Sequence, residues 1–316
     1  MERYLEVNTV RLRQLRREQA LSQQELANFA GTTQETISRL ERGHSAARGH
    51  TIRRLSEVLG VKPKELIKEV EEPFSISFPT GSSSSAIRVN QPAELPNALR
   101  KLGLHHSCPV LVVVGGAGKL TDDEMTRLRP LFVEVLAPLA EALGACVADG
   151  GTYSGVMHLM GQARTETQAS FPLVGVAATG TVALSGTPLP CPDATPLEPN
   201  HTHFVLVPGS EWGDDSPWLP RVVSVLAKGA PSVTVVINGG ENTWKDVSES
   251  VEAGRRVIAV AGSGRAADML VGALRGETVD ERGKELVASG LVQAVDVAAN
   301  PGRLSEMVKQ TLSARG

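Results

Sequence analysis

The spacing of apolar residues changes once along the chain. Up to about residue 72, apolar residues recur every three or four positions, as in Leu12, Leu15, Leu26, Ala27 and Ala30. This period predicts short amphipathic helices. From Pro109 onward, continuous runs rich in Val and Ile alternate with helical segments instead. Such runs are typical of parallel strands that are buried on both faces, so we expect a helical region followed by an α/β region.

The helical region contains signals for two consecutive short helices. Ser22 with Glu25 three residues later forms a capping box, which starts a helix. Gly31 interrupts that helix, Thr32 or Thr33 can cap the next one, and Gly43 ends it. Two helices of this length joined through a glycine turn predict a helix-turn-helix unit.

The α/β region is predicted from six apolar runs that serve as strands, at 110–114, 145–148, 173–178, 203–207, 233–238 and 257–261. A long helical segment at 121–144 separates the first two runs. Between the two regions, 73–96 contains four prolines and four consecutive serines, Ser82 to Ser85, which predicts a flexible or extended linker. The expected domains are therefore a helical domain at 1–72, the linker at 73–96 and a Rossmann-like parallel-sheet domain at 97–316.

Glycine clusters follow four of the predicted strands, and the carboxyl ends of parallel strands meet at one edge of a sheet. Glycines at the start of a helix leave backbone N–H groups free to hold an anion such as phosphate. Arg265 adds a guanidinium beside one cluster, Lys119 adds an ammonium beside another, and Asp268 can orient Arg265 or cap its helix. The expected ligand-binding residues here are Gly115, Gly116, Lys119, Gly150, Gly151, Thr152, Gly155, Gly239, Gly240, Gly262, Ser263, Gly264, Arg265 and Asp268.

Charge is distributed unevenly along the chain. Residues 8–54 carry nine arginines and four glutamates, a net +5, while the whole chain has a net charge of −3, so the remainder sums to −8. The helical domain is thus suited to a polyanion. No apolar run reaches the length of a membrane span, which predicts a cytoplasmic protein without membrane contact. Three widely spaced cysteines predict no disulfide, and His201 with His203 lacks a third ligand, so we expect no metal site.

The run LSQQELANFAGTTQETISRLERG resembles the phage-repressor helix-turn-helix family, the XRE or Cro/cI type, over about residues 8–70. The resemblance implies double-stranded DNA as partner, with the second helix in the major groove. The expected DNA-contacting residues are Gln23, Thr33, Gln34, Glu35, Thr36, Ser38 and Arg39. It also implies a palindromic operator and a homodimer or higher oligomer, for which the second domain is the candidate interface. The loop HSAARGH after Gly43 differs from the loop of one repressor subgroup. The alternative to DNA binding is that the helical domain is a small bundle that contacts another protein.

The stretches VVVGGAGKL, ADGGTYSGVMHLMGQA, NHTHFVLV, VTVVINGGENT and VIAVAGSGRAADML resemble the SLOG superfamily. Within it they are most similar to the cytosolic domain of TRPM channels and its prokaryotic relatives, over about residues 108–275. The resemblance implies a Rossmann-like fold that binds a nucleotide-derived ligand such as ADP-ribose or cyclic ADP-ribose, adds His203 to the expected ligand contacts, and requires no further cofactor. We therefore expect a ligand-responsive transcriptional regulator.

Two alternatives to a regulator remain open. SLOG phosphoribohydrolases carry P-G-G-x-G-T-x-x-E, and the nearest stretch here, Pro208-Gly-Ser-Glu-Trp-Gly-Asp-Asp-Ser216, alters its second glycine, its threonine and the carboxylate spacing. These changes favour binding without turnover, although Glu211, Asp214 and Asp215 leave hydrolysis of a nucleotide or of NAD open. The other alternative is a defence or stress effector that assembles on ligand binding.

Overall fold

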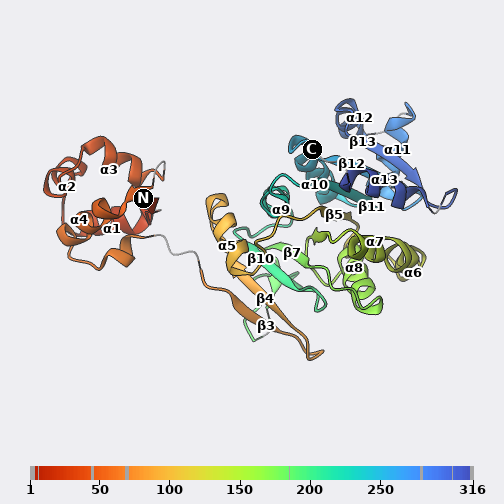
Figure 1. Ribbon diagram of the computed structural model, residues 1–316, viewed down its shortest axis with the longest axis horizontal. Helices are drawn as coiled ribbons and strands as arrows, with labels where there is room; N and C mark the ends of the chain where they lie inside the picture. Colours follow the sequence, from red (N-terminus) through yellow and green to blue (C-terminus); the bar gives the residue numbers. More distant parts are fainter. Residues whose placement is uncertain are drawn as a thin grey trace. The chain divides into compact units, whose positions relative to one another are not determined.

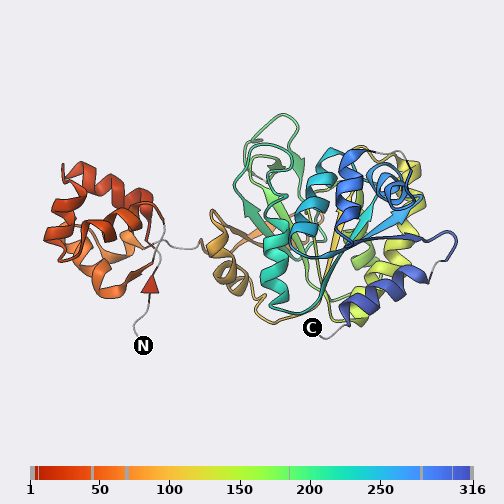
Figure 2. The same cartoon turned by 90° about the horizontal axis from the view of Figure 1, so that it is seen from above.

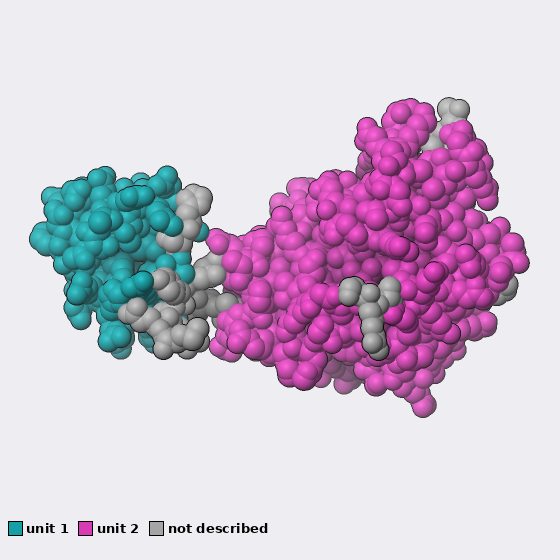
Figure 3. Space-filling model, turned by 45° about the horizontal axis from the view of Figure 1, so that its top comes forward, with its two compact units in different colours: residues 1–70 teal, residues 71–316 magenta. Residues whose placement is uncertain are grey.

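The computed structural model describes residues 4–5, 7–43, 46–67, 71–184, 186–277, 280–300 and 302–313. The chain divides into two compact units, Met1–Val70 and Glu71–Gly316, which Figure 3 shows in different colours. Residues 44 and 45 of the loop after Gly43 lie outside the described residues. Each unit is described by itself below.

The first unit is helical, as the apolar spacing predicts (Figure 1). A two-stranded antiparallel pair joins β1 to β2, and the core is built from buried Leu, Ile and Ala side chains such as Leu12, Leu26, Ile37 and Leu55. Its elements are β1 (Tyr4–Leu5), α1 (Thr9–Glu18), α2 (Gln23–Phe29), α3 (Gln34–Glu41), β2 (Ala47–Arg48), α4 (Gly49–Val58) and the 3₁₀ turn η1 (Pro63–Leu66). The helices α2 and α3 are the predicted pair, with a Ser22–Glu25 capping box before α2 and Thr33 as the cap of α3.

A buried carboxylate fixes α1 against α3. Glu41 is 3% exposed, and its oxygens accept hydrogen bonds from Arg16 Nε at 2.6 Å and Gln23 Nε2 at 2.8 Å. Burial alone would raise the pKa of Glu41, but these hydrogen bonds and the nearby guanidinium groups outweigh it and lower the pKa. Because a buried charge without partners costs several kcal/mol, this arrangement favours one packing of the two helices.

The second unit contains a nine-stranded sheet in the order β13-β12-β11-β5-β6-β7-β10-β4-β3, parallel except for the β3–β4 pair. The six predicted strands are confirmed within one residue at each end. The strands are β3 (Phe74–Ser77), β4 (Ser83–Arg88), β5 (Val110–Gly115), β6 (Cys146–Asp149), β7 (Leu173–Ala178), β10 (His203–Val207), β11 (Ser232–Ile237), β12 (Arg256–Ala261) and β13 (Val292–Asp296). A small parallel pair, β8 (Val182–Ala183) with β9 (Thr195–Pro196), lies outside this sheet.

Helices cover both faces of the sheet (Figure 2). One face packs against α6 (Asp122–Pro130), the π-helical stretch η3 (Leu131–Leu136), α7 (Ala137–Ala142), α8 (Gly155–Glu166) and α13 (Arg303–Leu312), with Phe132 at the centre of their shared core. The other face carries α5 (Leu95–Lys101), α9 (Leu219–Ala227), α10 (Glu241–Glu252), α11 (Arg265–Leu274) and α12 (Glu281–Ala288). The predicted α/β architecture is therefore confirmed.

The predicted linker at 73–96 is wrong. Its first part forms the hairpin β3–β4, and β4 pairs in parallel with β10, with His203 opposite Ser85. The small polar side chains that suggested a linker are accommodated in the sheet: Ser84 is buried, and its hydroxyl donates to the carbonyl of His201. Ile87, which follows the serines, is fully buried. The second unit thus begins near residue 71 and not at residue 97.

This correction predicts that fragment 71–316 folds, whereas fragment 97–316 does not. The shorter fragment loses the buried side chains of Ile76, Ile87 and Val89, which is about 5 kcal/mol or more of hydrophobic stabilisation and comparable to the whole stability of a typical domain. Circular dichroism and tryptophan fluorescence of the two purified fragments test it. Equal cooperative unfolding of both fragments would show that the hairpin is dispensable.

Candidate functional site

A cavity of about 590 Å³ lies at the carboxyl edge of the sheet. The strand-to-helix turn after β5 and the start of α10 after β11 provide much of its lining, together with Ser154, Arg265, Trp212, Asp193 and the first residue of β9, Thr195. The strand β5 has β11 on one side and β6 on the other, so the chain order reverses here. Ligands of open α/β sheets bind at such a reversal.

Two cationic side chains, Lys119 and Arg265, line this cavity together with the carboxylates of Asp193 and Glu241. Gly240 caps the amino end of the twelve-residue helix α10, where unpaired N–H groups and the helix dipole favour an anion. The exposed guanidinium of Arg265 lies beside it, since a Cβ on Gly240 would be 3.4 Å from Arg265 Nη2. Lys119 lines the same cavity from the β5 turn. Arg265 adopts φ +51°, a backbone conformation that is rare for a side chain of this size.

The predicted ligand-binding residues divide into three groups. Four of them, Gly115, Lys119, Gly240 and Arg265, line the cavity. Gly150 and Thr152 line a smaller adjoining cavity of about 90 Å³ that shares Gly115 with the larger one. The remaining predicted residues lie outside both linings, and their positions show why glycine or a polar residue stands there.

Several predicted glycines are required by close backbone packing. A Cβ on Gly155 would lie 1.9 Å from the carbonyl oxygen of Gly116, and one on Gly151 would lie 2.8 Å from the Cα of Gly175. Gly155 and Gly151 also have positive φ values, +50° and +68°. Close backbone packing thus explains why glycine stands at 151 and 155, and Gly155 lets the start of α8 approach the β5 turn. Ligand contact at Gly116, Gly151 and Gly155 stays a prediction.

Hydrogen bonds hold the turn between β12 and α11 in place. Ser263 Oγ accepts from the backbone N–H of Asn238 at 2.8 Å, and Asn238 Nδ2 donates to the carbonyl of Ser263 at 2.8 Å. Asp268 Oδ1 accepts from the N–H of Gly262 at 2.7 Å, which ties the first turn of α11 back to the end of β12. Ser263, Asp268 and the glycines 239, 262 and 264 therefore belong to the turns next to Arg265 and do not line the cavity.

His203, one of the predicted ligand contacts, lies away from the cavity. It is the first residue of β10, at the amino end of the parallel strands, while the cavity lies at their carboxyl ends. Its Nδ1 is 2.8 Å from the hydroxyl of Thr202, and burial is the main cause that lowers the pKa of its imidazole. His203 therefore lies at the opposite edge of the sheet from this cavity, which does not support the predicted ligand contact.

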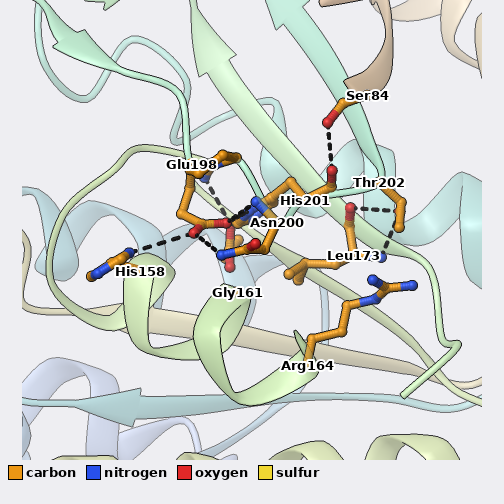
Figure 4. A network of polar contacts seen from close by, with 12 residues as sticks. Ser84, His158, Gly161, Arg164, Leu173, Glu198, Asn200, His201 and Thr202 are labelled. Carbon is orange, nitrogen blue, oxygen red and sulfur yellow. Dashed lines mark hydrogen bonds and ion pairs between the residues drawn. The ribbon is translucent and has the colours of Figure 1, made fainter. Parts of the chain in front are cut away.

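His201 belongs to a buried ionic network, which Figure 4 shows. Its Nε2 lies 2.8 Å from Asp149 Oδ1 and its Nδ1 lies 2.9 Å from Glu198 Oε2, and all three side chains are 0% exposed. Burial lowers the pKa of His201, but the two carboxylates outweigh it and raise the pKa to about 9. Burial likewise opposes ionisation of Glu198, yet hydrogen bonds from His158 and His201 lower its pKa to about 2. The imidazolium joins the end of β6 to the segment before β10.

Three further residues line the cavities, of which Trp212 and Asp215 belong to the stretch 208–216 compared above with the phosphoribohydrolase motif. Trp212 lines both cavities, is 37% exposed, and donates from Nε1 to Asp193 Oδ2 at 3.0 Å. Asp215 and Asp246 line the smaller cavity. Burial is the first cause that raises the pKa of each, and the neighbouring charge of Asp215 helps to raise that of Asp246 to about 7. Asp246 stands inside α10 without any motif around it, so sequence gave no signal for it.

The predicted DNA-contacting residues lie on or beside α3. Ile37 and Leu40 are buried, whereas Gln34, Glu35 and Arg39 are exposed on the other side of the helix. Thr36 and Ser38 are half-buried, and Thr33 caps the helix by accepting from the N–H of Thr36. Gln23 differs from the others because its amide donates to the buried carboxylate of Glu41. Except for Gln23, whose donor group is engaged there, this set presents a polar face with long side chains.

Comparison with known proteins finds a family match in each of the two units. The family model "SLOG in TRPM, prokaryote" matches residues 108–306. The chain belongs to this family. A second model, a helix-turn-helix, matches residues 12–66, which confirms the XRE-type resemblance. The protein thus joins a helix-turn-helix domain to a SLOG domain of the TRPM type.

The SLOG domain is similar to parts of much longer proteins. A TRPM member-like 2 cation channel of Nematostella vectensis is 30% identical over 198 residues, and TRPM member 2 of Mus musculus is 26% identical over 196 residues. Each match covers 51% of this chain but 13% of the relative. Among the residues that the structure describes, no helix has the length and apolar character of a membrane span, and no group of acidic, His or Cys side chains has the arrangement of a metal site.

The buried imidazolium predicts a pH-dependent stability of the SLOG domain. The folded pKa of His201, about 9, is above the usual value near 6.5, so its contribution is complete below about pH 6.5 and is lost as the pH rises through 9. The expected loss is about 3 kcal/mol. Urea unfolding of the full chain, followed by tryptophan fluorescence, measures it, since all three tryptophans lie in this domain.

The test variant is His201→Gln. Its matched control is His106→Gln, because His106 is an exposed histidine of the same domain. H201Q should be less stable at pH 6 and should lose the fall in stability between pH 6.5 and 9, whereas H106Q should keep it. A pH dependence that is unchanged in H201Q would assign the effect to other groups.

Proposed function

We propose that this protein is a DNA-binding transcriptional regulator whose SLOG domain senses a nucleotide-derived small molecule. The observation that carries the proposal is the cavity at the strand reversal, which is lined by Arg265, Lys119 and the amino end of α10, in a chain that also presents an exposed polar face on α3. One unit has the chemistry for an anionic ligand and the other has the chemistry for DNA.

The cavity favours a ligand of the ADP-ribose type. Its volume of about 590 Å³ lies within the range of small-molecule sites, about 300–1,000 Å³. The two cationic side chains and the helix terminus suit a pyrophosphate, and the indole of Trp212 offers an aromatic surface in the same cavity. ADP-ribose and its cyclic isomers carry both a pyrophosphate and an aromatic base, which match these groups. The similarity to TRPM proteins supports this class of ligand.

The DNA-binding part of the proposal includes a homodimer or higher homo-oligomer. A single head of this type reads few base pairs, so tight binding requires two heads on a palindromic operator. We propose that the SLOG domain provides the contact between copies and that the ligand favours one arrangement of the heads, because a ligand with equal affinity for both arrangements would change nothing.

A hydrolase is the second candidate, and the Asp215–Asp246 pair favours it. Both carboxyl groups line the small cavity next to the ligand site, and Ser216 Oγ donates to Asp246 Oδ1 at 2.6 Å. With a pKa of about 7, Asp246 is partly protonated at neutral pH and can donate or accept a proton. Release of free base or nicotinamide from AMP or NAD, lost in Asp246→Asn, would support this candidate over a sensor.

Arg265→Ala should weaken the binding of ADP-ribose by about ten- to a hundred-fold, because it removes charge-assisted hydrogen bonds worth roughly 1.5–3 kcal/mol. Isothermal titration calorimetry with the full chain measures it. The matched control is Arg275→Ala, which removes an exposed arginine at the far end of the same helix. Absence of binding by ADP-ribose, its cyclic isomers and AMP to the wild type would overturn the sensor proposal.

Arg39→Ala should weaken binding to a selected operator by about ten-fold or more, since a bidentate arginine–base contact contributes roughly 1–3 kcal/mol. The operator is obtained by selection from random duplexes, and affinity is measured by fluorescence anisotropy at fixed salt. Arg100→Ala, an exposed arginine of the SLOG domain, is the control for loss of one positive charge. Equal affinities of R39A and R100A would place α3 outside the groove.

A further inference from the structure

Two cysteines of the SLOG domain lie side by side at the amino ends of its central strands. Cys146 is the first residue of β6, and Cys108 stands two residues before β5. The chain places them 38 residues apart, yet their Sγ atoms are 2.7 Å from each other. Both are free thiols in this structure. We propose that Cys108 and Cys146 are a modification site, at which a hydroperoxide converts the two thiols into a reversible disulfide.

The backbone around the pair is held in place. The N–H of Cys146 donates to the carbonyl of Pro109 at 2.9 Å, which continues the β5–β6 ladder to the residue beside Cys108. Ser107 Oγ donates to the carbonyl of Ala227, and Lys228 Nζ donates to the carbonyl of His105, each at 2.6 Å. A disulfide has an S–S bond of about 2.05 Å, so the sulfur atoms need to approach by only about 0.7 Å.

The two thiols have different chemical roles. Cys108 is half-buried and Cys146 is buried, so a small oxidant reaches Cys108 first. The hydrogen bond with Cys146 is the main cause that lowers the pKa of Cys108 to about 7, while the same contact and burial raise the pKa of Cys146. Cys108 therefore supplies the thiolate that reacts, and Cys146 is the resolving thiol.

The reaction needs no group other than the hydroperoxide. The Cys108 thiolate attacks one peroxide oxygen and the O–O bond breaks, which gives a sulfenic acid and, with hydrogen peroxide, one water after protonation. The sulfur of Cys146 then attacks the sulfur of Cys108, the S–O bond breaks, and the leaving hydroxide takes the Cys146 proton as a second water. Two thiols are oxidised to one disulfide, and one peroxide is reduced to two waters.

The disulfide would link the two central strands at the edge opposite the cavity. It closes a loop of the chain that includes α6, η3 and α7, and it restricts the unfolded chain. The oxidised domain should therefore unfold at a higher temperature than the reduced domain. This inference does not depend on the ligand or on DNA binding, so it goes beyond the proposed function.

Peptide mapping of the full-length protein tests the proposal. The reduced protein is treated with equimolar hydrogen peroxide, blocked with an alkylating reagent, digested and analysed by mass spectrometry. We expect a peptide pair joined through Cys108 and Cys146, reversed by dithiothreitol, while Cys191 is alkylated. The third cysteine is an internal control, because the neighbouring Asp193 raises its pKa.

Two variants sharpen the result. Cys191→Ser should form the same disulfide, and Cys146→Ser should instead leave a sulfenic acid on Cys108 that dimedone traps. The proposal is overturned if Cys108 and Cys146 stay as accessible to alkylation after peroxide as before, or if cross-links to Cys191 form as often as the expected one. The wild-type map alone decides this, even if a variant fails to fold.

Discussion

Close backbone contact at the carboxyl edge of the sheet is the constraint on which the SLOG domain depends. The carbonyl oxygen of Gly116 lies where a Cβ of Gly155 would be, and the carbonyl oxygen of Ile237 lies where a Cβ of Gly115 would be, at 1.9 Å in both cases. No side chain larger than hydrogen fits at these positions. The ends of β5 and β11 and the start of α8 therefore meet at van der Waals distance. This packing brings the turn after β5 to the amino end of α10, where Arg265 also lines the cavity.

Buried charges fix the connections that packing alone would leave variable. In the SLOG domain, His201 lies between Asp149 and Glu198, and Asp149 also accepts from the N–H of Gly151. The end of β6 is thereby tied to the segment that leads into β10. In the helix-turn-helix unit, Glu41 with Arg16 has the same role between α3 and α1. A buried ion pair adds little net stability, but breaking it is expensive, so it favours one arrangement over its alternatives.

The sequence predicted the features that depend on local pattern. Apolar periodicity identified the helices of the first unit and six strands of the second, and the glycine clusters identified the edge that carries the cavity. It failed where the outcome depends on contacts between distant segments. The serines of 73–96 have a linker composition, yet Ser84 is satisfied by a carbonyl of residue 201, so a hairpin forms. The glycines at 151 and 155 also carry a packing constraint that no motif reveals, because only the fold shows the backbone atoms next to them. Asp246 lines the smaller cavity from inside α10, where no motif surrounds it, and Trp212 belongs to the altered motif at 208–216, which did not mark it as a ligand contact.

The proposed regulator has one candidate site in each unit. Regulation requires that ligand binding at one site change the affinity of the other site for DNA. Thermodynamic linkage makes that coupling measurable from either site. The most direct test is the affinity of the full-length protein for its selected operator, measured by fluorescence anisotropy with and without saturating ADP-ribose. At an ADP-ribose concentration that saturates the wild type but leaves Arg265→Ala mostly unbound, the account predicts a change in Kd of about five-fold or more in the wild type and a much smaller one in the variant. An unchanged operator affinity, while calorimetry shows ADP-ribose bound to the same sample, would contradict it.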